Sequence, residues 1–307
     1  MESETEREKN TINSLSAERL EEYKEAMLSK HSELYGRFFT EPLIYEILHD
    51  ESLEHSDKKV VNSKLTAVIN MFISLIYGES QSADPSLNLV RTNYTFCSKK
   101  LQVSADLEAL MQVIEMIDLK QNPELFRQSA SAKEVKSLYK NLVNLKFPKL
   151  SVDANGCPEE KEKRSKEVIK IITYNFKEFE LETISSVYKV VLKTKNPFFP
   201  PKYINLYIKV GKLAEKKEKI LICKFLLMFI VSPGKIELLE VVCSFLYLLI
   251  TRKDSALRFK NIAVVFAPIF FIDDESSIVD ATFKETMERL KDFLEFFLEN
   301  SPEIFLL

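Results

Sequence analysis

Apolar residues recur at helical spacing through most of the chain. Behind Ser104, a residue type that favours helix N-caps, apolar side chains follow the i, i+3, i+4, i+7 pattern from residue 107 to residue 117. Ser131 and Glu134 have the spacing of a capping box and precede a second such pattern. Further helices are predicted over residues 181–194, 203–214, 220–231, 236–251, 257–267 and 282–299, the fifth of them ended by Pro268. No convincing run of alternating apolar and polar residues predicts strands, so the predicted class is all-α.

The first 88 residues form a helical extension in this pattern. Ser14 or Ser16 is placed to cap a helix that runs to about Tyr35, and two more helical stretches cover residues 43–48 and 60–76. The stretch that follows, up to residue 88, is polar and contains a proline, which is typical of a linker. Residues 1–92 carry 10 Lys or Arg against 17 Asp or Glu, and the rest of the chain carries 33 against 29. We therefore expect an acidic N-terminal extension and linker over 1–88 and a main domain over 89–307.

The composition argues against several kinds of chemistry. Only 5 residues are glycine, which disfavours phosphate-binding loops built on glycine. All 3 histidines lie within the first 55 residues, so the main domain lacks the usual general base and zinc ligand, and we expect no metal site. The 4 cysteines are widely spaced, as expected for reduced thiols in a cytoplasmic protein. No apolar run reaches the roughly 20 residues of a membrane span, and the charged start does not resemble a secretory signal.

The middle of the chain is basic. Residues 120–219 hold 22 Lys or Arg against 12 Asp or Glu, which suits an acidic partner. Lysines solvated on helix surfaces explain the same balance equally well. The absence of tryptophan, and of aromatic residues interleaved with the lysines, argues against RNA. We expect no nucleic-acid partner, whereas peripheral contact with an anionic membrane stays open.

Three segments of the main domain carry candidate contact residues. Arg127 follows two apolar residues that would anchor its loop, so its planar guanidinium would project from a rigid base toward a phosphate. Lys189 and Lys193 lie one helical turn apart, with Ser185, on a polar stripe where an anionic partner would relieve their repulsion. Asn261 begins a very apolar segment. The plainer alternatives are a surface arginine, a solvated helix face and an amide that satisfies the backbone near a helix start.

Taken in order, these segments resemble the GTPase-activating domain of the Rho family (RhoGAP). Residues 125–131, LFRQSAS, resemble the arginine-finger block of the family, G-I-F-R-x-S-G/A-S. Residues 187–193, VYKVVLK, together with Pro197, resemble its L-L-K-x-x-L-R-E-L-P-E-P-L block. Residues 261–268, NIAVVFAP, resemble N-L-A-V-V-F-G-P, the most specific of the three blocks. The resemblance covers about residues 93–305 and implies a RhoGAP-like helical bundle.

The resemblance also implies a partner and a role for each residue. Arg127 would be the arginine finger that enters the active site of a Rho, Rac or Cdc42-type small GTPase and stimulates GTP hydrolysis. Lys189 would support the finger loop and contact the switch region, Lys193 would belong to the same partner-binding surface, and Asn261 would hydrogen-bond the GTPase. The chain would have no intrinsic catalysis and no cofactor of its own, since the GTPase carries the GTP, the Mg²⁺ and the glutamine that positions water.

Departures from the family pattern keep alternatives open. Glu124 stands where the family has a glycine beside the finger, and Lys193 replaces an arginine and loses its bidentate fork. Ala267 replaces the glycine of F-G-P, and the L-P-E-P turn is shortened. One alternative is a catalytically weak or inactive scaffold that binds a GTPase without stimulating it. Another is a helical adaptor whose basic middle binds anionic lipid or RNA.

Overall fold

Helices make up nearly all of the regular structure. The computed structural model describes residues 11–48, 89–97, 101–144, 176, 179–195, 197–272 and 282–307. In chain order, the elements are η1 (Ile12–Ser14), α1 (Ala17–Lys30), α2 (Ser32–Phe38), α3 (Glu41–Leu48), β1 (Leu89–Thr92), β2 (Leu101–Ser104), α6 (Ala105–Glu115), α7 (Ala132–Asn144), α9 (Leu181–Lys193), η3 (Pro201–Tyr203), α10 (Ile204–Gly211), α11 (Lys216–Phe229), α12 (Pro233–Thr251), α13 (Phe259–Phe271), α14 (Thr282–Glu299) and α15 (Ser301–Phe305). The prediction of a mainly helical protein is confirmed.

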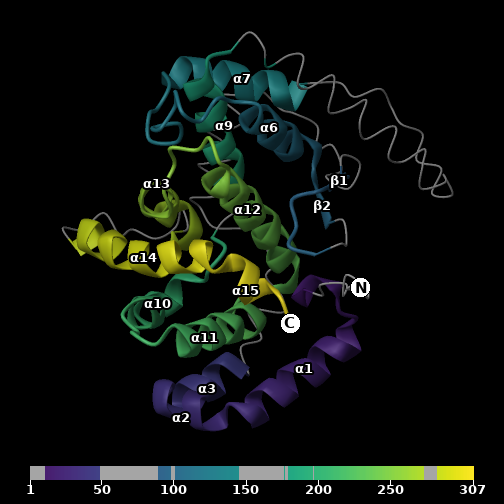
Figure 1. Ribbon diagram of the computed structural model, residues 1–307, viewed down its shortest axis with the longest axis vertical. Helices are drawn as coiled ribbons and strands as arrows, with labels where there is room; N and C mark the ends of the chain where they lie inside the picture. Colours follow the sequence, from purple (N-terminus) through teal and green to yellow (C-terminus); the bar gives the residue numbers. More distant parts are fainter. Residues whose placement is uncertain are drawn as a thin grey trace, which may run out of the picture.

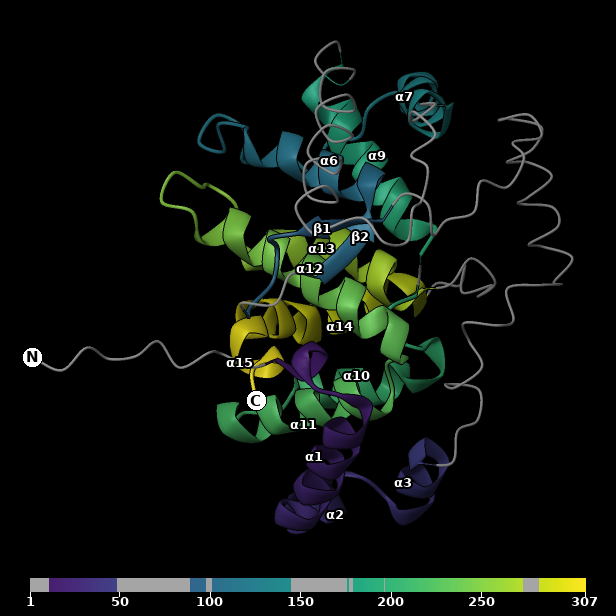
Figure 2. The same ribbon diagram turned by 90° about the vertical axis from the view of Figure 1, so that its right-hand side faces the viewer.

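The helices are arranged along one long axis of the molecule. At one end lie α6, α7 and α9, where α6 and α7 both pack on α9, and α12 passes through the middle (Figure 1). Next to it, α13 packs along α14, and α10 connects α14 to α11. At the opposite end lie α1, α2 and α3, and the view turned by 90° keeps the same order from end to end (Figure 2). Within the described residues, no helix has the length and apolarity needed to cross a bilayer.

Local capping signals place several helix starts. Ser131 and Glu134 form the predicted cap of α7: the Ser131 hydroxyl accepts from the Glu134 N–H at 3.3 Å and donates to its carboxylate at 2.6 Å. Ser16, rather than Ser14, caps α1 by accepting from the Arg19 N–H at 3.3 Å. The predicted single helix up to Tyr35 is divided, because the chain leaves helical geometry at His31 and starts again as α2.

A small antiparallel hairpin was missed by the sequence analysis. β1 and β2 pair with Leu89 opposite Ser104 and Thr92 opposite Leu101. Each strand alternates between exposed and buried positions, but over only 4 residues. Such a short alternation does not stand out from the surrounding sequence, and the pairing across the turn supplies what the pattern lacks.

The expectation that Pro268 ends its helix is wrong. α13 continues one turn further, to Phe271, with Pro268 inside it. Proline costs this helix one N–H hydrogen bond. The last turn is retained because Phe270 and Phe271 are fully buried, with ring centroids 4.9 Å from Phe198 and 5.3 Å from Phe199. Tertiary packing therefore outweighs the local signal of the proline.

The N-terminal helices share the core of the main domain. The rings of Tyr35 and Phe39 lie 4.9 and 4.7 Å from the ring of Phe225 on α11. Nearer the start, Asn13 donates to the buried carboxylate of Glu240 on α12 at 2.7 Å. Residues 11–48 are thus joined to the main domain by packing. The predicted helix over 60–76 and the linker that ends at residue 88 lie outside the described residues, so the boundary stays a prediction.

Candidate functional site

The loop between α6 and α7, residues 116–131, carries Arg127. α6 ends at Glu115, earlier than its apolar pattern predicts, and the loop then follows the surface as a series of turns. Leu125 and Phe126 are 4% and 1% exposed. The ring of Phe126 lies 6.0 Å from Tyr188 of α9 and 5.3 Å from Phe266 of α13. The α6–α7 loop is therefore anchored in the core immediately before Arg127.

Arg127 itself points to solvent. Its side chain is 72% exposed, and its main-chain N–H donates to the carbonyl of Glu124 at 2.8 Å, which closes a tight turn. The guanidinium forms an ion pair with the Glu124 carboxylate at 3.2 Å. The sequence analysis singled out both residues, but only the structure shows that Glu124 is bound to Arg127.

Lys189 of α9 contacts the main chain of the α6–α7 loop next to Arg127. Its ammonium donates to the main-chain carbonyl of Phe126 at 2.7 Å, and burial lowers the pKa of this lysine. Lys189 is therefore not an unpaired cation on a solvated stripe, as the i, i+4 pattern had suggested. Ser185 departs from that stripe too, because it is fully buried and donates to the carbonyl of Glu182. Lys193 lies exposed in the last turn of α9.

Ser186 is a second contact between α9 and the loop, and the sequence analysis missed it. Its hydroxyl accepts from the main-chain N–H of Ala130 at 3.3 Å. Ser186 precedes Lys189 by three residues, so the two lie on the same face of α9. That spacing was visible in the sequence, but serine at an interior helix position has no distinctive signal without its partner. Together the two residues hold the chain on both sides of Arg127.

The exposed face of α13 carries the fourth predicted residue, Asn261. It lies in the first turn of the helix and is exposed. One turn further, Val264 is 49% exposed and adds an apolar side chain to the same face. The opposite face of the helix places Phe266 against Phe126. The loop, α9 and α13 thus meet around Phe126, which unites the three elements that carry Arg127, Lys189, Lys193 and Asn261.

Several lysines of the basic region bond within the protein. In addition to Lys189, Lys209 donates to the main-chain carbonyl of Phe38 and Lys219 to that of Gly211. Beyond the basic region, Lys224 and Lys235 donate in the same way to Leu306 and Pro197. A lysine that satisfies a carbonyl and buries part of its stem contributes to the charge balance without forming a patch for a partner. Part of the positive excess is therefore structural, which weakens the interpretation as an adaptor for lipid or RNA.

Comparison with known proteins identifies the class. Residues 105–275, more than half of the chain, match the RhoGAP domain. The chain therefore belongs to the RhoGAP family.

Two solved structures are similar to the chain. The BH domain from GRAF, the GTPase regulator associated with focal adhesion kinase, has a TM-score of 0.46 at 18% identity, over 66% of this chain and 93% of that one. Human Rho GTPase activating protein 15 has a TM-score of 0.47 at 12% identity, over 66% and 85%. A comparison with curated protein sequences finds no match.

Proposed function

We propose that this protein stimulates GTP hydrolysis by a Rho-family small GTPase, with Arg127 as its arginine finger. The observation that carries the proposal is the geometry of Arg127: an exposed guanidinium directly follows a fully anchored Phe126, within the segment that matches the family. A flexible arginine would lose conformational entropy on entering a partner site, whereas a rigid base reduces that cost. The α6–α7 loop is built in this way.

In this mechanism the partner supplies the nucleotide, the Mg²⁺ and the attacking water, and this chain brings no cofactor. Arg127 neutralises charge that develops on the transferred phosphoryl group, a contribution worth about 10³ to 10⁵ in rate. Lys189 keeps the carbonyl of Phe126 in place, which fixes the backbone next to the finger. Lys193, Asn261 and the exposed Val264 contact the GTPase surface. A cytoplasmic location fits such a partner.

A non-catalytic scaffold is the second candidate, and the ion pair between Arg127 and Glu124 favours it. The carboxylate lies 3.2 Å from the guanidinium and competes with phosphate oxygens for the same donors. Because the side chains of Arg127 and Glu124 are 72% and 39% exposed, such a pair is worth only about 0.2–1 kcal/mol. That energy is small beside the contribution of an arginine finger, so the pair weakens catalysis without abolishing it.

Phosphate release measured with Rho, Rac and Cdc42-type GTPases tests the proposed function. Stimulation of at least one of them is the expected result, with binding of each GTP-loaded GTPase measured in parallel. Binding without stimulation would favour the scaffold. If the protein neither binds nor stimulates any of these GTPases, both the proposed activity and the scaffold are contradicted.

Glu124→Gln is expected to raise kcat/KM for stimulation by up to about fivefold, because it frees the guanidinium at a cost of one exposed ion pair. The gain should be largest at low ionic strength, where the ion pair is least screened. The matched control is Glu303→Gln, which removes an exposed carboxylate paired with Lys216 at 3.1 Å on another helix. Titration of phosphate release against salt for both variants checks the prediction. A decrease in kcat/KM would show that Glu124 assists the finger.

A further inference from the structure

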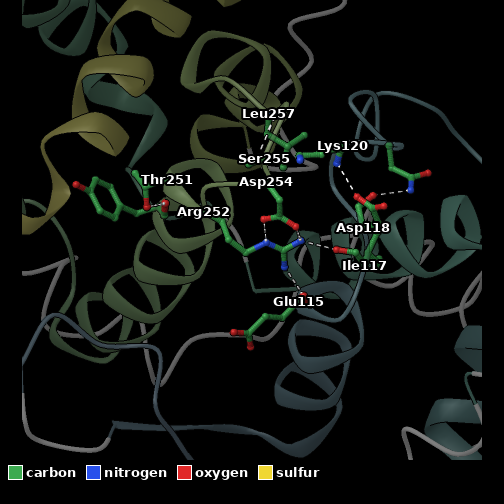
Figure 3. Close-up of polar contacts among 11 residues, drawn as sticks. Glu115, Ile117, Asp118, Lys120, Thr251, Arg252, Asp254, Ser255 and Leu257 are labelled. Carbon is green, nitrogen blue, oxygen red and sulfur yellow. Dashed lines mark hydrogen bonds and ion pairs between the residues drawn. The ribbon is translucent and has the colours of Figure 1, made fainter.

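A guanidinium from α12 holds the start of the α6–α7 loop. Arg252 directly follows α12, and its side chain is 25% exposed. It donates to the main-chain carbonyl of Glu115, the last residue of α6, and to that of Ile117, two residues further (Figure 3). The carbonyls at the end of a helix lack partners within the helix. A cation at this end is also favoured by the helix dipole, so Arg252 serves as a cap supplied from another element.

Asp254 orients this guanidinium. Its two carboxylate oxygens accept from Nε and from one terminal nitrogen of Arg252, the latter at 3.0 Å, and Figure 3 shows the carboxylate facing the guanidinium, which in turn reaches the end of α6. The hydrogen bond from Arg252 lowers the pKa of the Asp254 carboxyl. All three guanidinium nitrogens are thus engaged. Because the guanidinium is planar and is bonded both to Asp254 and to the carbonyls of Glu115 and Ile117, its orientation is fixed as well as its distance from α6.

Two hydrogen bonds from α9 hold the loop close to Arg127. Lys189 holds the carbonyl of Phe126, and Ser186 holds the N–H of Ala130. The first part of the loop bonds mainly within itself: the Lys120 N–H and the Asn122 amide both reach Asp118. A hydrogen bond from Arg252 to the Ile117 carbonyl connects this part of the loop to α12, and the side chain of Leu119 is buried in the core.

We propose that Arg252, oriented by Asp254, is a positioning residue for Arg127. By fixing the direction in which the chain leaves α6, it determines where the loop presents the finger. A displacement of about 1 Å in a reacting group costs roughly 10²-fold in rate, so a loop start released from Arg252 would lower catalysis while the anchoring by Phe126 persists. The kinetic part of this inference rests on the proposed function, and its structural part does not.

Hydrogen exchange tests the structural part on the full-length chain. In Arg252→Met, the amides of Arg127 and Gln128, which both donate to the Glu124 carbonyl, should exchange about tenfold faster than in the wild type. The control is Arg37→Met, which removes an exposed arginine paired with Glu218 at 2.9 Å at the opposite end of the molecule. The control should leave these amides unchanged. Equal exchange in Arg252→Met and the wild type would overturn the proposal.

Steady-state kinetics with a responsive GTPase tests the catalytic part. Arg252→Met should lower kcat for stimulated hydrolysis by about tenfold or more and leave KM within about threefold, because the surfaces of α9 and α13 remain in place. Arg252→Lys should recover part of kcat, since an ammonium can reach one carbonyl but not both. Faster exchange with an unchanged kcat would make Arg252 purely structural and overturn its positioning role, as would a rise in KM alone. If the wild type stimulates no GTPase, the proposed function fails, and the exchange measurement alone decides whether Arg252 fixes the loop.

Discussion

Arg127→Ala should lower the stimulation of GTP hydrolysis by about 10³-fold or more. The substitution removes an exposed guanidinium and leaves the buried Phe126 that anchors the loop, so the fold is retained. Affinity for the GTP-bound GTPase should fall by only about threefold, because the finger makes its contribution mainly in the transition state. Single-turnover phosphate release measures the first quantity, and binding to a GTPase loaded with a non-hydrolysable GTP analogue measures the second.

Two further variants complete this test. Arg127→Lys keeps the charge but not the planar fork, so it should recover little activity. Arg37→Met removes an arginine at the far end and should stimulate like the wild type. Fluoride-based phosphoryl mimics added to the GDP-bound GTPase should tighten the wild-type complex and not the complex of Arg127→Ala. If Arg127→Ala stimulates as well as the wild type, the assignment of the finger is wrong.

Phe225→Ala should lower the free energy of unfolding by about 3–5 kcal/mol. The ring of Phe225 is fully buried on α11, 4.9 Å from Tyr35, 4.7 Å from Phe39 and 4.6 Å from Phe229. Truncation leaves a cavity where the N-terminal helices pack on the main domain, and the surrounding rings collapse into it only in part. Denaturant unfolding followed by circular dichroism gives the change.

Val264→Ala is the control for this measurement. Val264 is 49% exposed, so truncating this apolar side chain to alanine should change the free energy of unfolding by less than about 0.5 kcal/mol. Folded Phe225→Ala protein should keep its GTPase stimulation, because α11 lies away from the α6–α7 loop (Figure 1). A loss below about 1 kcal/mol would instead show that the N-terminal helices add little to the core, as a separable extension would.

The sequence identified the residues of the candidate site, but it did not predict the contacts among them. Arg127 and Glu124 are three residues apart, so their proximity followed from the chain, although the ion pair between them was not predicted. Lys189 and Phe126 are 63 residues apart, and no local pattern indicates that a lysine on an amphipathic helix donates to a distant carbonyl. From the helical pattern alone the lysine was interpreted as a surface cation, whereas the resemblance to the RhoGAP family implied that it supports the finger loop.

By itself, the sequence determined the helical class, the capped start of α7 and the order of the three blocks that place the chain in its family, because periodicity, capping and motifs act over a few residues. The tertiary structure alone decided the continuation of α13 past Pro268, the packing of Tyr35 and Phe39 on α11 and the hydrogen bonds from Arg252 to the end of α6. Each of these depends on burial or on a hydrogen bond between residues far apart in the chain. Such contacts form only when the whole core assembles, and their energies then exceed the local preferences that the sequence displays.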